Sequence, residues 1–423
     1  MIRRQIILVS IILLFSDLFN WWDQLNSIDY IHLSLIIIRS HLQLRILMVS
    51  GFAPSRFARN EGGSERYCFN LSKRLQSLGH ELTIYTSKYP SNTPVYEAYD
   101  GVPIVRFRTW WFAMQINPMS FFWKALDRHL DDYDLVHVHS YIFFVANQVA
   151  MLRKFKRRFP FVLHLHGGLE YISPSLMGVK ASAMKVFYDA TVGPFTIRTA
   201  DRVIACCETD RQRAIEKFGA EPDRVVTIPN CIDSTAFKES RRPNPVNVTY
   251  IGRLTELKGS HQLPQIVKTI CRGHRDIRFT IVGGGALEDS LRRVLKNYPV
   301  NFLGRVPHEA IPNILANSSI LILPSFLEGF PLVTLEAHAS SIPVVCYDVG
   351  GCWESVVTGE TGALVPVGDV KHFIGVLDWM IDDEGYRIKM GERGRRNVLE
   401  KYDWSVAVRR ILEVYGTIAS KHS

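Results

Sequence analysis

Residues 324–337 read PSFLEGFPLVTLEA, and they predict a turn followed by a helix, directly after a short buried strand at residues 320–323. Pro331 favours the first helical position, where its missing N–H has no intrahelical partner to lose. Glu328 in the turn and Glu336 in the helix flank the unpaired N–H groups of the helix start, which attract anions. Two interpretations stay open: the acids cap or solvate the helix, or they bind sugar hydroxyls while the backbone binds a diphosphate. The second suits a nucleotide-sugar.

Length and composition predict a globular protein of two domains. The chain has 423 residues, of which 47% are hydrophobic and 22% charged, enough apolar material for two cores. A net charge of +9 favours anionic partners such as nucleotide-sugars or acidic lipid headgroups. Nucleic acid is not expected as a partner, because zinc-finger spacing and RNA-binding aromatic signatures are missing. The seven cysteines show no C-x2-C spacing and indicate core thiols in a reducing compartment.

The first 43 residues differ from the rest of the chain. Arg3 and Arg4 precede an apolar run at residues 6–15, which resembles the start of a signal peptide. The run is short for a membrane span, Asp17 follows it, and no small-residue cleavage site is present. We expect either a misassigned start, with the true one at Leu44 or Met48, or an interfacial anchor, and we favour the first.

From residue 44 onward, short apolar strands alternate with helix-like segments, which predicts parallel sheets with right-handed crossovers. The predicted strands are 46–50, 81–86, 102–107, 135–139, 161–166, 202–206, 246–251, 278–282, 301–303, 320–323 and 343–347. A polar, proline-containing linker at residues 238–245 separates two groups of strands. We therefore predict an α/β protein with two Rossmann-like, doubly wound domains at 44–240 and 241–404. A helix at 405–423 crosses back to the first domain, and a ligand binds in the cleft at the strands' carboxyl ends.

Two loops of the second domain carry further candidate residues. Arg253 and Lys258 lie on a glycine-bounded loop after the strand 246–251, where a guanidinium and an ammonium suit phosphate oxygens. Residues 283–285 are three glycines after the next strand, which permit close approach to a ligand or simply form a tight turn. The GxGxxG pattern is not met, so a nicotinamide site is disfavoured.

In the first domain, Gly62 and Gly63 precede a predicted helix that begins near Ser64, and they indicate either a second anion-binding helix start or a capped turn. His166 ends a strand, where it either faces the cleft or, as is more common, is a hydrogen-bonded structural histidine. Metal binding by His137, His139 and His164 is rejected, since no carboxylate completes the set. The DxD-like residues 132–134 precede a strand rather than follow one, so we interpret them as a polar loop.

From about residue 44 to the end, the chain resembles glycosyltransferase family 4, which has the GT-B fold. Glu328 and Glu336 are in register with the E-x7-E motif of that family. The resemblance also rests on Gly252-Arg253 with Lys258-Gly259, residues 62–65, His166-Gly167 and residues 228–233. Cys231 stands where the family usually has glycine, which leaves the local backbone conformation open.

The resemblance implies retaining sugar transfer from a nucleotide diphosphate-sugar, with UDP or GDP as the nucleotide and no cofactor or metal. It implies that Glu336 holds the ribose, Glu328 the donor sugar, and Arg253 and Lys258 the diphosphate, with His166 near the reacting centre. These last four, Glu328, Arg253, Lys258 and His166, form the catalytic set. The implied donor site comprises Gly62, Gly63, Arg253, Lys258, Val306, Gly329, Phe330, Leu332, Val333 and Glu336.

The acceptor is expected to be a glycan or a lipid-linked glycan of cell-surface polysaccharide or glycolipid synthesis. Residues 106–112, 121–124 and 153–158 mix aromatic and basic side chains, which favours an anionic membrane surface, although the aromatics can equally pack in a core. We expect a cytoplasmic protein, peripheral at the inner face of the cell membrane. The rival functions are a nucleotide-sugar epimerase on the same fold and a non-catalytic nucleotide-sugar binding protein.

Overall fold

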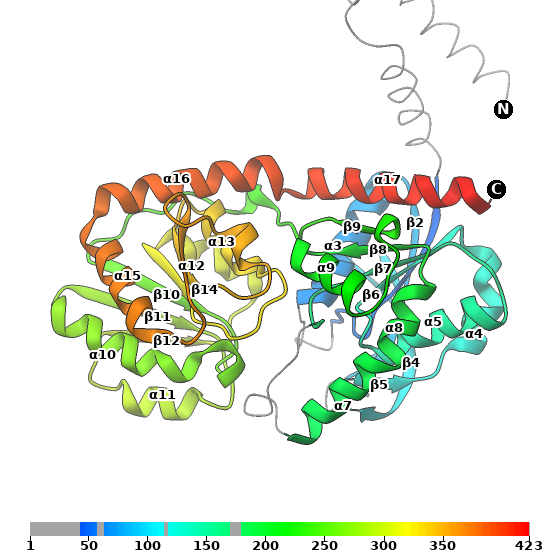
Figure 1. The fold of residues 1–423 in the computed structure, drawn as a ribbon, viewed down its shortest axis with the longest axis horizontal. Helices are drawn as coiled ribbons and strands as arrows, with labels where there is room; N and C mark the ends of the chain where they lie inside the picture. Colours follow the sequence, from blue (N-terminus) through cyan, green and yellow to red (C-terminus); the bar gives the residue numbers. More distant parts are fainter. Residues whose placement is uncertain (1–42, 57–62, 114–116, 170–178, 423) are drawn as a thin grey trace, which may run out of the picture. The chain divides into compact units, whose positions relative to one another are not determined.

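The computed structural model describes residues 43–56, 63–113, 117–169 and 179–422, and it contains two sheets (Figure 1). We call the parts built around them the N-lobe and the C-lobe. The segment before residue 43 lies outside the described residues, so both hypotheses on residues 1–43 stay predictions.

The N-lobe sheet has the strand order β3-β4-β2-β1-β6-β7-β8-β9, and β5 pairs with β4. The pairs of β4 with β3 and with β5 are antiparallel, and the others are parallel. The strands are β1 Arg45–Val49, β2 Glu81–Lys88, β3 Tyr96–Tyr99, β4 Val102–Ala113, β5 Asn117–Ser120, β6 Leu135–His139, β7 Phe161–His164, β8 Arg202–Ala205 and β9 Val225–Thr227. The helices are α3 Gly63–Ser77, α4 Trp123–His129, α5 Phe144–Phe155, α7 Val179–Ala190, α8 Val192–Thr199 and α9 Glu208–Glu216.

The C-lobe sheet has the order β12-β11-β10-β13-β14-β15 and is parallel throughout. This is the doubly wound order 3-2-1-4-5-6, which turns at the boundary between β10 and β13. The strands are β10 Val246–Ile251, β11 Ile277–Val282, β12 Val300–Gly304, β13 Ile320–Leu323, β14 Val344–Tyr347 and β15 Gly362–Val365. The helices are α10 Leu263–Gly273, α11 Glu288–Val294, α12 Ile311–Ala316, α13 Leu332–Ala339, α14 Cys352–Ser355, α15 Val370–Asp382 and α16 Glu384–Lys401.

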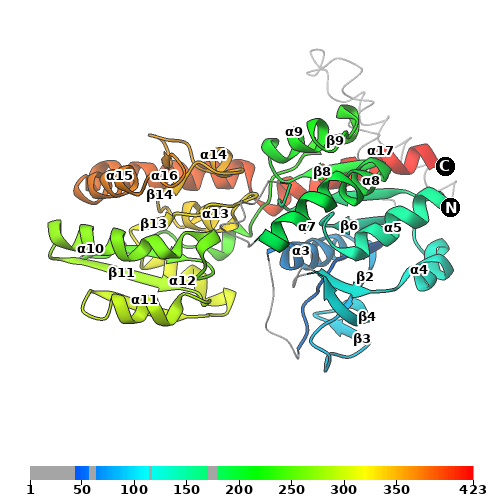
Figure 2. The same cartoon turned by 60° about the horizontal axis from the view of Figure 1, so that its bottom comes forward.

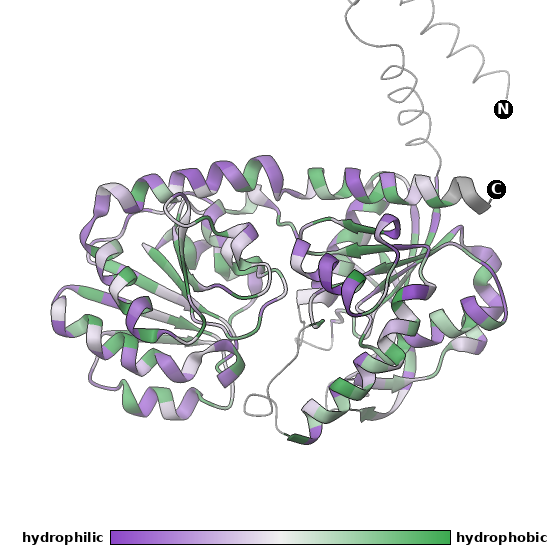
Figure 3. Cartoon of the chain, in the orientation of Figure 1, coloured by the Kyte–Doolittle hydropathy of each residue, from purple (hydrophilic) through white to green (hydrophobic). Residues whose placement is uncertain are grey.

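Helices cover both faces of each sheet, so strand residues of both parities are buried (Figures 2 and 3). In β13, Ile320 and Ile322 pack with α10, α11 and α15, whereas Leu321 and Leu323 pack with α12 and α13. The same alternation holds in β1, where Leu47 and Val49 pack with residues of α4, α5 and α8. A near-continuous apolar strand is the expected sequence of a parallel sheet that is buried on both sides.

The last helix, α17 (Trp404–His422), completes the core of the N-lobe although it follows the C-lobe in sequence. Trp404, Val408, Ile411 and Tyr415 are buried against residues of α3, β1 and β2. Figure 1 shows α16 and α17 as consecutive helices at the red end of the chain, the first beside the C-lobe and the second beside the N-lobe.

The predicted α/β class with two Rossmann-like sheets is confirmed, and the strands 135–139, 246–251 and 320–323 have the predicted bounds. Two boundaries were wrong in ways that concern the site. The strand predicted at 161–166 ends at His164, so His166 belongs to the following loop. Pro331 is the residue that caps α13 and not its first helical residue, which is Leu332.

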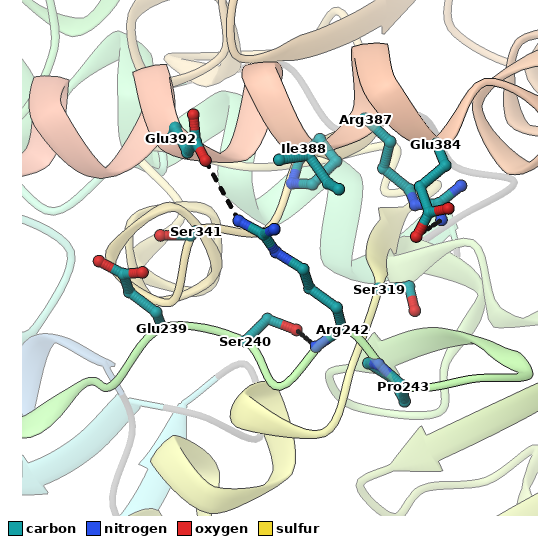
Figure 4. A pocket seen from close by; sticks show the side chains of 11 residues that line it. Glu239, Ser240, Arg242, Pro243, Ser319, Ser341, Glu384, Arg387, Ile388 and Glu392 are labelled. Atoms are coloured by element: carbon teal, nitrogen blue, oxygen red, sulfur yellow. Dashed lines mark hydrogen bonds and ion pairs between the residues drawn. The ribbon is translucent and has the colours of Figure 1, made fainter.

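The linker at residues 238–245 precedes β10 and has no regular secondary structure. Figure 4 shows the pocket that it lines, where Arg242 Nη2 lies 3.2 Å from Glu392 Oε1 of α16. Ser319 and Pro343 in the same pocket precede β13 and β14. Ligands of doubly wound sheets bind at the opposite, carboxyl ends of the strands, so this pocket is not the expected ligand site.

Candidate active site

The two loops that leave the C-lobe switch point meet through an ion pair. Lys258, in the loop after β10, places its Nζ 2.7 Å from Glu328 Oε1, in the loop after β13. The same Nζ donates to Leu327 O at 3.3 Å. Both side chains are largely buried, at 20% and 10% exposure, so solvent screens this pair less than a surface pair. The sequence-predicted cation and carboxylate therefore form one unit.

Glycines let these loops pack backbone against backbone. Gly259 has φ +68°, and a Cβ on it would lie 1.7 Å from Pro324 O. A Cβ on Gly283, which has φ +128°, would lie 1.9 Å from Gly252 O, and one on Gly285 would lie 2.4 Å from Leu254 O. Gly283 and Gly285 thus serve the packing of the Arg253 loop, as a tight turn would, and close approach to a ligand stays a prediction.

Glu336 is buried in α13 and bonds to His308, a residue that sequence reasoning missed. His308 Nε2 lies 2.7 Å from Glu336 Oε1. His308 follows β12 in the same loop as Val306, which belongs to the donor site that the resemblance implies. Its position at a strand's carboxyl end was the one signal in the sequence that pointed to it.

Anion-binding groups beside this pair remain unengaged within the described part of the chain. The Arg253 side chain is exposed and has no hydrogen-bond or ion-pair partner there. The backbone N–H groups of Gly329, Phe330, Leu332 and Val333 likewise bond to no described residue. Since the first N–H groups of a helix have no intrahelical partner, these groups and Arg253 together suit a diphosphate.

Residues of the two lobes meet at a pair of glycines next to Glu328. A Cβ on Gly329 would lie 2.8 Å from Gly167 Cα, and one on Gly167 would lie 2.9 Å from Gly329 Cα. Asn230 Nδ2 donates to Phe330 O at 3.1 Å, which adds a polar contact at the same place. His166, predicted as the cleft histidine, is thereby brought beside the loop of Glu328.

A second set of contacts joins α14 to the start of α9. The Glu354 carboxylate accepts from Glu208 N at 2.6 Å, and Trp353 Nε1 donates to Thr209 Oγ1 at 3.1 Å. Burial raises the pKa of Glu354 to about 7. Gly350 and Gly351 lie between these contacts and the Glu328 loop, where a Cβ on Gly350 would lie 1.8 Å from Glu328 O. Sequence reasoning missed these two glycines, which carry no motif beyond their place after β14.

His166 belongs to a group of four histidines from β6, β7 and the loop that follows. His139 and His164 are register partners, so their side chains share a face of the sheet with His137. Ligand atoms of His137, His139 and His164 lie within 4.8 Å of one another. The rings of His137 and His139 are stacked, however, with centroids 4.5 Å apart and planes 26° apart. Nitrogens of face-stacked rings do not converge on one ion, which disfavours a metal more strongly than the missing carboxylate does.

The remaining predicted site residues are placed as follows. Gly62 lies outside the described residues, whereas Gly63 is exposed at the described end of α3 with open space around its Cα. Cys231 is buried, is not in the left-handed region, and places its Sγ 3.9 Å from Tyr67 OH. Its side chain therefore fits where the related motif has glycine. Asp134 bonds Arg45 N at 2.7 Å at the amino ends of the strands, as expected for a polar loop.

Comparison with known proteins agrees with this geometry. The model of Glycosyltransferase Family 4 matches residues 61–236, and the model of Glycosyl transferases group 1 matches residues 232–397. The chain belongs to the family 4 glycosyltransferases. It is a transferase with the GT-B fold.

Named relatives span most of this glycosyltransferase. It is 25% identical over 386 residues to the phosphatidylinositol N-acetylglucosaminyltransferase GPI3 subunit of Saccharomyces cerevisiae, covering 86% of this chain and 81% of the relative. It is 27% identical over 404 residues to glycogen synthase of Mycobacterium tuberculosis, covering 88% and 94%. Anabaena Alr3699/HepE in complex with UDP-glucose has the same fold, with a TM-score of 0.70, 19% identity and coverage of 89% and 100%.

Proposed function

We propose that this glycosyltransferase moves a hexosyl group from a UDP- or GDP-linked sugar to a glycan or lipid-linked acceptor, with retention at the anomeric carbon and without a metal. The observation that carries the proposal is the ion pair of Lys258 with Glu328 at the C-lobe switch point. The Arg253 side chain and the backbone N–H groups of the turn that begins at Gly329 lie in the same loops, and these groups bond to no described residue. The structure of Alr3699/HepE, which has a similar fold, was solved in complex with UDP-glucose, and this supports a donor of the same class. Cell-surface polysaccharide or glycolipid synthesis is the proposed role.

In this proposal the leaving diphosphate gains negative charge as the glycosidic bond breaks. Arg253, Lys258 and the N–H groups from Gly329 to Val333 stabilise that charge, because they are already oriented before the reaction. Glu336, held by His308, accepts from the ribose hydroxyls, and Val306 lies beside the base. Glu328 orients Lys258 and accepts from the donor sugar. The contact between Gly167 and Gly329 limits the access of water to the reacting carbon.

Incubation with a panel of UDP-, GDP- and ADP-sugars tests the proposal. We expect nucleotide release from one donor that rises when an acceptor extract is added. Isomerised donor without nucleotide release would establish the epimerase alternative. Donor binding in a thermal-shift assay without any turnover would establish the binding-protein alternative.

Helix α7 suggests the acceptor class, because polar side chains of this helix are buried and apolar side chains are exposed. Its polar residues Ser182 and Lys185 are buried, and Lys185 pairs with Asp189 beneath Tyr141. Val179 and Phe187 instead point outward and are 75% and 69% exposed. Figure 3 shows α7 as a largely hydrophobic helix. An outward apolar face on a helix marks a surface for a membrane or a partner.

The N-lobe carries further exposed aromatic and basic side chains outside α7. Arg106 and Phe107 belong to the core, so core packing holds for that part of the predicted segments, whereas Trp110, Trp111, Phe121 and Trp123 are exposed. Lys156 Nζ lies 5.7 Å from the centre of the Trp123 ring. The end of α7 lines a cavity of about 760 Å³ with six basic side chains: Arg153, Lys154, Arg158, Arg198, Lys217 and Arg224.

Interfacial aromatics beside cations suit an anionic bilayer, and we propose attachment of the N-lobe to the inner face of the cell membrane with a lipid-linked acceptor. The name of the GPI3 relative includes phosphatidylinositol, which supports a lipid acceptor class. No helix within the described residues has the length and apolar composition to cross a membrane.

Flotation with vesicles containing about 30% anionic lipid, a fraction that makes cation attraction measurable, tests the attachment. Val186 of α7 is exposed like its neighbour Phe187. We expect binding by the natural protein and its loss in the double variant Val186→Ser, Phe187→Ser. Leu399→Ser, which changes an exposed leucine of the C-lobe, is the matched control. Absence of binding by the natural protein, or equal binding by all three proteins, would contradict the proposal.

A further inference from the structure

His137, His139, His164 and His166 form a cluster of near-parallel rings on one face of the N-lobe sheet and in the loop after β7, and we call this cluster the stack. Neighbouring rings have centroids 4.5 to 5.5 Å apart and planes within 26° of parallel. His137, His139 and His164 have no exposed surface. Such a buried row is uncommon, because each neutral imidazole brings a donor and an acceptor that need partners.

Hydrogen bonds distinguish the members of this stack. His139 Nδ1 lies 2.9 Å from His166 Nε2. His137 Nδ1 lies 2.6 Å from Tyr415 OH of α17. His164 has no hydrogen bond on either nitrogen within the described residues. His139 is thus the member that contacts the ring of the cleft histidine directly.

Burial keeps all four rings neutral. It lowers the pKa of His137, His139 and His164 well below the usual range and that of His166 to about 3. With its Nε2 2.9 Å from His139 Nδ1, the His166 ring therefore stays uncharged near neutral pH.

We propose that His139 is a positioning residue for sugar transfer, whose Nδ1 holds the His166 ring in one tautomer and one rotamer. The proposal rests on the function proposed above. At the 2.9 Å contact one nitrogen carries the proton and the other accepts it, so the tautomer of His139 sets that of His166. The held ring fixes the backbone of Gly167, which touches Gly329 next to Glu328.

Packing around the stack makes this control rigid. The Tyr67 ring lies 5.0 Å from that of His164, 5.2 Å from that of His166 and 4.7 Å from that of Trp404. The stack is thereby enclosed by α3 and α17. An imidazole fixed by packing loses little entropy when it orients a neighbour, which is how supporting residues align a reacting group.

A matched pair of variants separates hydrogen bonding from packing. His139→Phe removes the contact with His166 but keeps a planar ring in the stack. His164→Phe makes the same change at a ring without a hydrogen bond. We expect His139→Phe to lower kcat about 30-fold, within the range for misplacement of a reacting group, with the donor KM within threefold. His164→Phe should stay within threefold in kcat.

Two further measurements make the result specific. His139→Asn places an amide where Nδ1 was and should recover most of kcat. In ¹⁵N-histidine-labelled protein, His166 should show one tautomer in the natural protein and a mixture in His139→Phe. Equal losses in both phenylalanine variants, unchanged kcat in folded His139→Phe, or an unchanged tautomer would each overturn the proposal.

Activity of the natural protein distinguishes this failure from failure of the proposed function. If no donor releases nucleotide with the natural protein, the proposed function fails, while the tautomer measurement still decides the role of His139. If the natural protein is active and the two phenylalanine variants do not differ, only the role of His139 fails.

Discussion

The two lobes share the same strand order around their switch points but carry opposite kinds of side chains there. Loops of the C-lobe bring Arg253, Lys258 and Glu328 to the carboxyl ends of β10 and β13. Strands of the N-lobe bring neutral histidines to the ends of β6 and β7. One lobe thus supplies charge for a diphosphate and the other supplies an uncharged, tightly packed wall. The comparison indicates that sheet topology fixes where a site forms, while loop residues decide its chemistry.

The largest effect is expected from the charged lobe. Lys258→Ala should lower kcat about 10²- to 10³-fold, because a preorganised cation no longer stabilises the leaving diphosphate. Lys296→Ala, at an exposed lysine of the same lobe, is the control and should leave kcat unchanged. Steady-state nucleotide release measures both. Full activity of a folded Lys258→Ala protein would contradict the proposal that the C-lobe supplies charge for the diphosphate.

An intermediate effect is expected where the lobes touch. Gly329→Ala places a Cβ 2.8 Å from Gly167 Cα, so the two backbones must move apart. We expect about a tenfold loss of kcat, since small displacements of reacting groups slow transfer. Gly375→Ala in α15 is the control, because its Cβ meets nothing within 4 Å. Kinetics at saturating donor check this prediction, and equal kcat in the two variants would show that the glycine contact is not needed.

The smallest effect concerns the contact of α14 with α9. Burial raises the pKa of Glu354 to about 7 in the folded protein, above its ordinary value of 4.5. Its contribution to stability is therefore fully present below pH 4.5 and is lost as the pH rises through 7. At about pH 8 the melting temperature of Glu354→Gln should equal or exceed that of the natural protein. The melting temperature of the variant relative to the natural protein should rise between about pH 5 and pH 8. A difference in melting temperature between the two proteins that does not change across that pH range would contradict the raised pKa of Glu354.

Much of the fold was predictable from the sequence, because a buried parallel strand such as 320–323 is a continuous apolar run that ends at Pro324, and the strand 246–251 is bounded by Pro245 and Gly252. The E-x7-E spacing and the Arg253–Lys258 loop indicated where the proposed donor binds, because each of these motifs lies within one short stretch of sequence. The ion pair between Lys258 and Glu328 was not predictable, since 70 residues separate its partners and only the sheet order joins them.

Other parts of the site depend on tertiary contacts that leave no local pattern. His308 bonds Glu336 across two elements of the C-lobe, and Gly167 meets Gly329 between the lobes. The alternation of residues 137 and 139 indicated a shared face, but ring stacking depends on how α3 and α17 close over it. Sequence spacing gives the side of the sheet on which a side chain lies and does not give the orientation of its ring.

Helix α17 also determines the order in which the chain can fold during synthesis. Domains made first usually fold first. Here Trp404, Val408, Ile411 and Tyr415 belong to the core of the first-made lobe, so that core stays open on one face until these residues leave the ribosome. The strands of the C-lobe, from Val246 to Val365, emerge earlier and can pair while the N-lobe is unfinished. The N-lobe core is therefore expected to close only after translation has passed α17.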